Sequence, residues 1–202
     1  MKTHFKNEKT LVLIKPDGIQ RSLIGEVVGR FERVGLKLVA MKLVLASANQ
    51  AEKHYTLNSS WKKNVGEKSI ESYKKKGLKP PSENPIEMGD VVLERLKKFI
   101  SAGPIVAMVW QGAHSVEVVR KLVGGTEPLS SDVGTIRGDF VMDSYQMADL
   151  DDRSVRNIVH ASGSVDEAEQ EIKHWFLENE VINYRLAQEQ ILYDVDWDGI
   201  LE

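Results

Sequence analysis

Short apolar runs alternate along the chain with stretches in which apolar residues recur every three or four positions. Runs rich in Val, Ile and Leu predict strands, and the longer recurrence predicts amphipathic helices. Strands are expected over residues 10–14, 36–45, 104–110 and, as a fourth, within 135–141. Helices are expected over residues 23–34, 47–55, 91–99, 114–122 and from 165, with a further helix and an exposed loop within 62–85. The alternation predicts one α/β sandwich and leaves the direction of strand pairing open.

A turn places Lys15 at the end of the first predicted strand. Pro16, Asp17 and Gly18 follow it directly. Proline presets φ, aspartate bonds its own backbone and glycine tolerates positive φ, so this tripeptide is typical of a turn. The strand before it is wholly apolar and therefore central, so the ammonium group of Lys15 is expected where a central strand ends.

The last predicted long helix carries a carboxylate on its buried side. Ser164 and Glu167 form an S-x-x-E capping box, which predicts a helix that begins at about residue 165. Its apolar stripe consists of Val165, Ala168, Ile172, Trp175 and Phe176. Glu171 lies on one edge of this stripe, so its side chain is expected to point inward.

Composition limits the classes of function. The 202 residues are 42% hydrophobic, enough for one substantial core, so a single domain over 1–202 is expected. The net charge of −3 gives no basic bias for nucleic acid or an anionic membrane. The absence of cysteine excludes disulfides, thiolate catalysis and zinc–thiolate sites. The apolar run 11–14 is too short for a signal peptide or a membrane span, so a cytoplasmic protein is expected.

His160 and a set of basic and polar residues are the candidates for chemistry. An imidazole, with an ordinary pKa near 6.5, is available as a neutral nucleophile at pH 7. Neither G-x-x-x-x-G-K-[ST] nor G-x-G-x-x-G occurs, so any nucleotide site must be built from side chains. The side chains considered for it are Lys15, Arg120, Thr126, Arg137 and Asn157. Each has a structural alternative as well; Arg137, for example, could pair with Asp139.

Four runs of sequence together resemble the nucleoside diphosphate kinase family. They are Ile14–Gly18, Gly103–Trp110, Gly134–Phe140 and Arg156–His160. The resemblance extends from about Lys9 to Tyr193 and is specific because the runs follow one another in the family's order. It implies a ferredoxin-like fold, with a four-stranded antiparallel sheet covered by helices. It also implies a ping-pong reaction, in which the γ-phosphoryl group of a nucleoside triphosphate passes to a nucleoside diphosphate through a phosphohistidine.

The resemblance implies catalytic roles for five residues. His160 would be the phosphorylated nucleophile. Glu171 would orient its imidazole and hold its tautomer, with Ser162 in the same network. Lys15 and Tyr55 would reach the transferred phosphoryl group.

It also implies how the nucleotide binds. Arg120, Thr126 and Arg137 would bind the remaining phosphates, and Asn157, with the lysine of the first strand, would bind the sugar hydroxyl. Trp61 would stack on the base, and an aromatic face accepts any base. Mg²⁺ would bridge the nucleotide phosphates rather than occupy a cage of protein ligands.

The chain departs from the family pattern in several places. Ala161 and Gly163 stand where many relatives have glycine and aspartate. Segments near 66–88 and 143–156 are interpreted as insertions, and 194–202 as an extended acidic tail. The family implies homo-oligomers built from dimers, as tetramers or hexamers. Two other functions stay open: a nucleotide-binding interaction protein that has lost turnover, and a phosphocarrier that receives its phosphoryl group from a protein kinase.

Overall fold

The computed structural model describes residues 5–193, and its centre is a four-stranded antiparallel sheet. The strands are β1 (Glu8–Ile14), β2 (Lys37–Leu45), β3 (Pro104–Gly112) and β4 (Val159–Ala161), in the spatial order β2-β3-β1-β4. In this register Leu11 faces Val109, and Leu13 faces His160. This order and pairing confirm the predicted ferredoxin-like fold. The predicted tail 194–202 lies outside the described residues.

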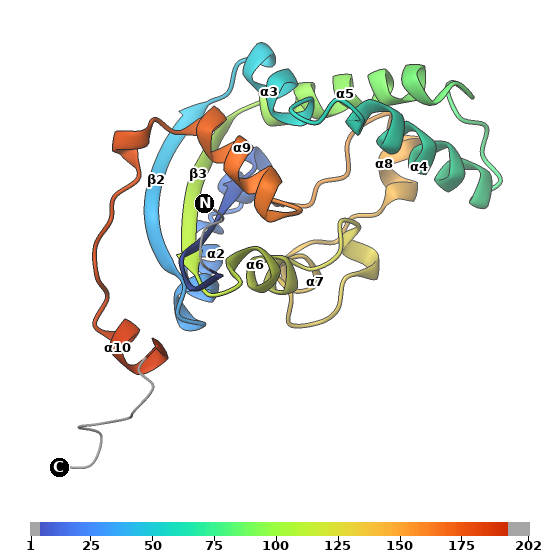
Figure 1. Ribbon diagram of the computed structural model, residues 1–202. Coiled ribbons are helices and arrows are strands. Elements are labelled where there is room, and N and C mark those ends of the chain that lie inside the picture. The colour runs from blue at the N-terminus through green and yellow to red at the C-terminus, as the bar shows by residue number, and fades with distance from the viewer. Residues whose placement is uncertain (1–4, 194–202) are drawn as a thin grey trace.

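Helices connect the strands and cover both faces of the sheet (Figure 1). The segment η1 (Phe5–Asn7) precedes β1, and β1 is joined to β2 by α1 (Pro16–Gln20) and α2 (Ile24–Arg33). The connection from β2 to β3 holds α3 (Ala48–Tyr55), α4 (Trp61–Lys75) and α5 (Pro85–Ile100). The connection from β3 to β4 holds α6 (Ser115–Val123), η2 (Pro128–Ser130), α7 (Ile136–Phe140) and α8 (Tyr145–Leu150). After β4 come α9 (Val165–Trp175), η3 (Glu178–Glu180) and α10 (Gln188–Tyr193). Within residues 5–193, no helix has the length and apolar character needed to cross a membrane.

Alternate side chains of β1 enter two different hydrophobic layers. Val12 and Ile14 belong to the layer covered by α2 and α6, whereas Leu11 and Leu13 belong to the layer covered by α3, α5 and α9. All four side chains are fully buried. Successive side chains of a strand point to opposite faces, so a strand covered on both faces needs a continuous apolar run. The prediction of β1 as a central strand is confirmed, since it lies between β3 and β4.

The expectation of a fourth strand within residues 135–141 is wrong. The Thr135 side chain accepts the N–H of Gly138 at 3.0 Å and so caps the short helix α7. A side-chain carbon at Gly138 would lie 2.1 Å from the carbonyl oxygen of Asp132, so the chain turns too tightly here for a strand. The fourth strand is β4, whose three residues are too few to show an alternating pattern. His160 is its middle residue.

The two segments predicted to be insertions meet in space. Helices α4 and α5 pack so closely that a side-chain carbon at Gly66 would lie 1.8 Å from the carbonyl oxygen of Pro85. The second segment forms α8, and its Asp149 carboxylate lies 2.9 Å from the Lys76 ammonium group just after α4. Figure 1 shows α4, α5 and α8 together on the side of the molecule away from β2.

Candidate active site

The turn before β4 determines where His160 stands. Ile158 has a φ of 50°, which is rare for a β-branched residue. Its N–H is bound by the Asp17 carboxylate at 3.1 Å, and its carbonyl accepts the N–H of Lys15 at 2.8 Å. A side-chain carbon at Gly18 would lie 3.2 Å from that same carbonyl oxygen. The turn after β1 therefore holds the start of β4 in place and sets His160 beside Lys15.

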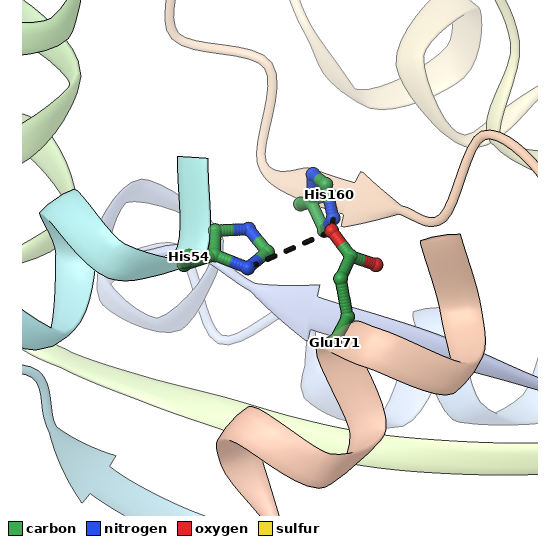
Figure 2. Close-up of side chains that lie close together, drawn as sticks. All are labelled: His54, His160 and Glu171. Atoms are coloured by element: carbon green, nitrogen blue, oxygen red, sulfur yellow. Dashed lines mark hydrogen bonds and ion pairs between the residues drawn. The ribbon is translucent and has the colours of Figure 1, made fainter. Parts of the chain in front are cut away.

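Glu171 binds His160 through one ring nitrogen (Figure 2). Nε2 of His160 lies 2.7 Å from Oε1 of Glu171, and the Ser162 hydroxyl donates to Oε2 at 2.6 Å. Burial by itself raises the pKa of Glu171, but the His160 imidazole and the hydrogen bonds from His160 and Ser162 outweigh it and hold the pKa at about 2. The carboxylate is thus ionised at neutral pH and accepts the Nε2 proton, which leaves Nδ1 as the unprotonated ring nitrogen. The prediction that Glu171 points inward is confirmed, because it is only 2% exposed.

A second histidine, His54, completes this cluster, and it is not among the residues predicted from the sequence. Its Nδ1 accepts the indole N–H of Trp175 at 3.2 Å, and its ring stands nearly perpendicular to that of His160 at a centroid distance of 4.5 Å. Burial is the main cause that lowers the pKa of His54 to about 3, so the ring is neutral at pH 7. The 3.6 Å approach of its Nδ1 to Glu171 in Figure 2 is therefore not an ion pair. One sequence signal could have found it. His54 lies three positions after Ala51 on α3, so the two residues share the buried face of that helix.

Lys15 and Asn157 are hydrogen-bonded to each other in the cavity that His160 also lines. The Lys15 ammonium donates to Oδ1 of Asn157 at 2.7 Å, and the Asn157 amide donates to the carbonyl of Thr126 at 2.8 Å. Burial and then the charge of Arg137 lower the pKa of Lys15 to about 7, against the opposing charge of Asp17. Near neutral pH this lysine therefore gains or loses its proton easily, and a bound anion favours the charged form.

Arg137 is held by the backbone and not by the acid next to it in sequence. Its guanidinium donates to four carbonyls, those of Gly124, Gly125, Asn157 and Val159. Asp139 instead binds Arg30 at 2.5 Å, so the alternative of an Arg137–Asp139 pair is wrong. Burial is the largest cause that lowers the pKa of Arg137 to about 10, and the group remains charged at neutral pH. Within residues 5–193 no carboxylate lies at salt-bridge distance from it, so its charge is available to an anion.

A cavity of about 1080 Å³ brings the predicted residues together. Its lining includes Lys15, Tyr55, Trp61, Arg120, Thr126, Arg137, Asn157, His160 and Glu171. Ser162 lies behind Glu171 and is fully buried. The buried Tyr55 hydroxyl has no hydrogen-bond partner within the described chain, and the Tyr55 ring lies 5.7 Å from that of Trp61.

The two segments predicted to be insertions also line this cavity, which the sequence interpretation missed. They contribute residues from α4 and α8, among them Ser69, Tyr73, Tyr145 and Asp149, and Arg95 of α5 lies beside them. The polar character of these segments favoured a solvated surface, and no local pattern indicated that the two would close over one pocket. Only the packing of α8 near α4 reveals this wall.

The carboxylates of the cavity do not form a cage for Mg²⁺, which prefers oxygen ligands. In the part of the chain that the structure describes, the grouping with metal-ligand spacing is His54, His160 and Glu171, whose ligand atoms lie within 4.8 Å of one another. Two of the three are imidazoles, and both Glu171 oxygens already interact with neighbouring side chains. This donor set does not fit Mg²⁺, which leaves nucleotide phosphates as its expected ligands.

These features define the class of protein: a ferredoxin-like α/β protein in which a carboxylate-bound histidine faces a cavity lined with cations. A sequence model of the nucleoside diphosphate kinase family matches residues 8–76 and 87–181. The chain belongs to the nucleoside diphosphate kinase family, and the predicted resemblance is confirmed.

Relatives agree over almost the whole chain. A nucleoside diphosphate kinase of Pyrobaculum aerophilum is 45% identical over 179 residues, which cover 87% of this chain and 98% of that protein. The crystal structure of an NDP kinase from the same organism matches with a TM-score of 0.85 and 43% identity, covering 88% of this chain and 100% of that one. A nucleoside diphosphate kinase structure from Borrelia burgdorferi, a transition state mimic with bound vanadate and ADP, matches with a TM-score of 0.77 at 38% identity, covering 93% of this chain and 98% of that one.

Proposed function

We propose that this protein is a nucleoside diphosphate kinase that carries the transferred phosphoryl group on Nδ1 of His160. One observation carries the proposal. The ionised Glu171 binds the opposite ring nitrogen at 2.7 Å, so the free lone pair lies on Nδ1 of a residue that lines the cavity. A covalent nucleophile divides the transfer into two similar steps.

In the first step Nδ1 attacks the γ-phosphorus of a nucleoside triphosphate. The N–P bond forms as the bond from phosphorus to the β–γ bridging oxygen breaks, and the diphosphate leaves with that electron pair. His160 becomes positively charged, and the ionised Glu171 stabilises this charge through Nε2–H. In the second step a terminal oxygen of another nucleoside diphosphate attacks the same phosphorus and restores the neutral imidazole. No net proton transfer is required.

The residues around His160 bind the phosphates and the sugar. Lys15 and the Tyr55 hydroxyl contact the transferred phosphoryl group, because phosphoryl transfer builds negative charge on the equatorial oxygens. Arg120, Thr126 and Arg137 bind the other phosphates. Phosphate charge would also be neutralised by a divalent cation, which we take to be Mg²⁺, brought in with the nucleotide.

Further residues of the cavity bind the nucleoside. Asn157 binds the sugar hydroxyl together with Lys15, whose ammonium group donates to the Asn157 amide oxygen at 2.7 Å. Trp61 stacks on the base. Stacking accepts every base, so we expect nucleotides of all four bases as substrates. Acceptance of both ribo- and deoxynucleotides stays a prediction from the resemblance. Homo-oligomeric assembly, a cytoplasmic location and the single domain with two insertions stay predictions from the sequence.

The test is formation and discharge of a phosphoenzyme. Incubation with γ-labelled triphosphate is expected to label the wild type with phosphate that is stable in alkali and labile in acid. Any added nucleoside diphosphate is expected to release the label as triphosphate. His160→Asn is expected to take no label. His114→Asn is the matched control, because His114 is exposed, lies outside the cavity lining and has a φ of 52° that asparagine adopts readily.

Other outcomes would point to the alternatives. A wild type that binds nucleotide without taking label would indicate a non-catalytic nucleotide-binding protein. Label that no diphosphate discharges would indicate a phosphocarrier. Label at normal stoichiometry on His160→Asn would exclude His160 as the nucleophile.

A further inference from the structure

The second insertion brings a tyrosine next to the proposed phosphate-binding residues. Tyr145 is the first residue of α8 and lines the same cavity as Thr126, Arg137 and His160. The Thr126 side chain is near enough to its hydroxyl for a hydrogen bond, and Arg137 is near enough to interact with it electrostatically. None of the roles assigned above includes this residue.

The ring and backbone of Tyr145 are held from several sides. Its N–H donates to the Glu127 carboxylate at 2.9 Å, and the preceding Ser144 caps α8 by accepting the N–H of Met147 at 3.2 Å. The Lys76 ammonium lies 5.5 Å from the centre of the ring, within the range of a cation–π contact. The phenol is therefore positioned before any ligand binds.

The chemistry of its surroundings selects an anionic ligand group. The Tyr145 side chain interacts with the Thr126 hydroxyl, with two cations, Arg137 and Lys76, and with two carboxylates, Glu127 and Asp149. Glu127 accepts the Tyr145 N–H at 2.9 Å, and Asp149 is paired with Lys76 at 2.9 Å. Burial and then the charge of Glu127 raise the pKa of Tyr145, so the phenol keeps its proton at neutral pH. It can accept a hydrogen bond from Thr126 and still donate one. Because both carboxylates already have partners, a proton donor beside the Arg137 guanidinium favours a phosphate oxygen over an uncharged base.

We propose that Tyr145 is a further nucleotide-binding residue, whose hydroxyl donates a hydrogen bond to the phosphate chain beside Thr126 and Arg137. The predicted insertion then contributes a residue to the proposed nucleotide site, and the contact with Lys76 holds the phenol in position. This inference rests on the proposed function, because that function supplies the nucleotide.

The test compares Tyr145→Phe with the wild type and with Tyr184→Phe. Tyr184→Phe is the matched control, because the Tyr184 hydroxyl also makes one hydrogen bond, to the carbonyl of Leu38 at 2.7 Å, but lies outside the cavity lining. Dissociation constants are measured for ADP, CDP and adenosine, and steady-state kinetics for both diphosphates. Removal of one hydrogen bond to a charged group is expected to weaken binding of both diphosphates by about tenfold to a hundredfold, through KM, and to leave adenosine binding unchanged.

The outcomes separate this inference from the proposed function. If the wild type and Tyr184→Phe are active and Tyr145→Phe binds both diphosphates equally well, the inference is wrong and the kinase assignment stands. Weaker binding of only one of the two diphosphates, or of adenosine, would show that the residue contacts the nucleoside and would also overturn it. A wild type without kinase activity would count against the proposed function itself.

Discussion

The two walls of the cavity are held together in different ways. On the sheet side, the polar groups behind His160 form a buried network in which Glu171 and Ser162 are almost fully removed from solvent. On the side formed by α4, α5 and α8, several contacts between the elements are ion pairs that reach the surface. Arg95 binds Asp152 at 2.7 Å, for example, but the Asp152 side chain is 86% exposed.

This difference separates the chemistry from the control of binding. A buried hydrogen-bonded charge is costly to break, because its partner is left without water or a counter-charge. An exposed ion pair contributes only about 0–1 kcal/mol and weakens with salt. The sheet side therefore fixes the imidazole, whereas the ion pairs on the other side each add little to the stability of that wall.

The largest effect is expected when the buried network is broken. Glu171→Gln replaces the ionised acceptor by a neutral amide, so the imidazole loses both its tautomer control and the charge that stabilises its cationic form. We expect kcat to fall by about 10²–10³-fold in steady-state assays. Glu169→Gln, on the exposed part of the same helix, is the control. A Glu171→Gln enzyme with at least a third of wild-type kcat would contradict the importance of the buried network.

A smaller effect, mainly on stability, is expected at the contact between α4 and α5. Gly66→Ala would place a carbon 1.8 Å from the carbonyl oxygen of Pro85, so the two helices must move apart. We expect a loss of about 1–3 kcal/mol in the free energy of unfolding, measured by urea denaturation. Gly29→Ala, where no atom lies within 4 Å of the new carbon, is expected to be neutral or stabilising. Equal stabilities of the two variants would show that the helix pair is loosely packed.

The charge of Lys15 is expected to make nucleotide capture depend on pH. Its pKa is lowered to about 7 in the free protein, so the ammonium loses its proton as pH rises through that value. Above that pH, kcat/KM for a diphosphate is expected to fall by up to about tenfold per pH unit, whereas kcat falls only at higher pH because bound phosphate retains the proton. In Lys15→Arg this falling limb is expected to disappear below pH 9, at lower absolute activity. An unchanged limb in Lys15→Arg would assign the titration to another group.

The smallest effect is expected when the ion pairs between α8 and the end of α4 are removed. Asp149→Asn removes the 2.9 Å pair with Lys76 and the 3.5 Å contact with Arg95. Because these are partly exposed pairs, we expect KM for nucleotides to rise by less than about fivefold, with kcat unchanged. Added salt is expected to reduce the difference from the wild type. Asp90→Asn is the control, since its 2.7 Å pair with Lys62 joins α4 and α5 away from the cavity. A large fall in kcat would contradict the view that this wall controls binding alone.

Sequence reasoning was most accurate where one residue pattern carries the physical signal. The apolar runs predicted β1 and β3, because strands buried on both faces must be apolar throughout. The run at β2 was predicted as well, although β2 lies at the edge of the sheet and its second half alternates between exposed and half-buried residues. The helical stripe on α9 predicted an inward Glu171, because the period of a helix determines which residues share a face. The start of α5 was predicted too late, at residue 91, although Asn84 caps it by accepting the N–H of Ile86.

One local cap and several long-range contacts explain the errors. The run 135–141 has the residues of a strand, but the Thr135 cap begins a helix there. The short strand β4 pairs with β1, and the bond from the Ile158 N–H to Asp17 fixes its start. His54 looked like an ordinary helical residue, because its partner Trp175 lies 121 positions away.

The sequence by itself determined the family, the central strands, and the histidine with its inward carboxylate, because local periodicity and ordered motifs encode these. Only the tertiary structure decided which nitrogen of His160 is free, that His54 packs against it, and that the two segments predicted to be insertions line one cavity. The physical reason is that these depend on hydrogen bonds and charges between side chains far apart in the chain. No local pattern records such distances, and folding alone brings the groups within reach of one another.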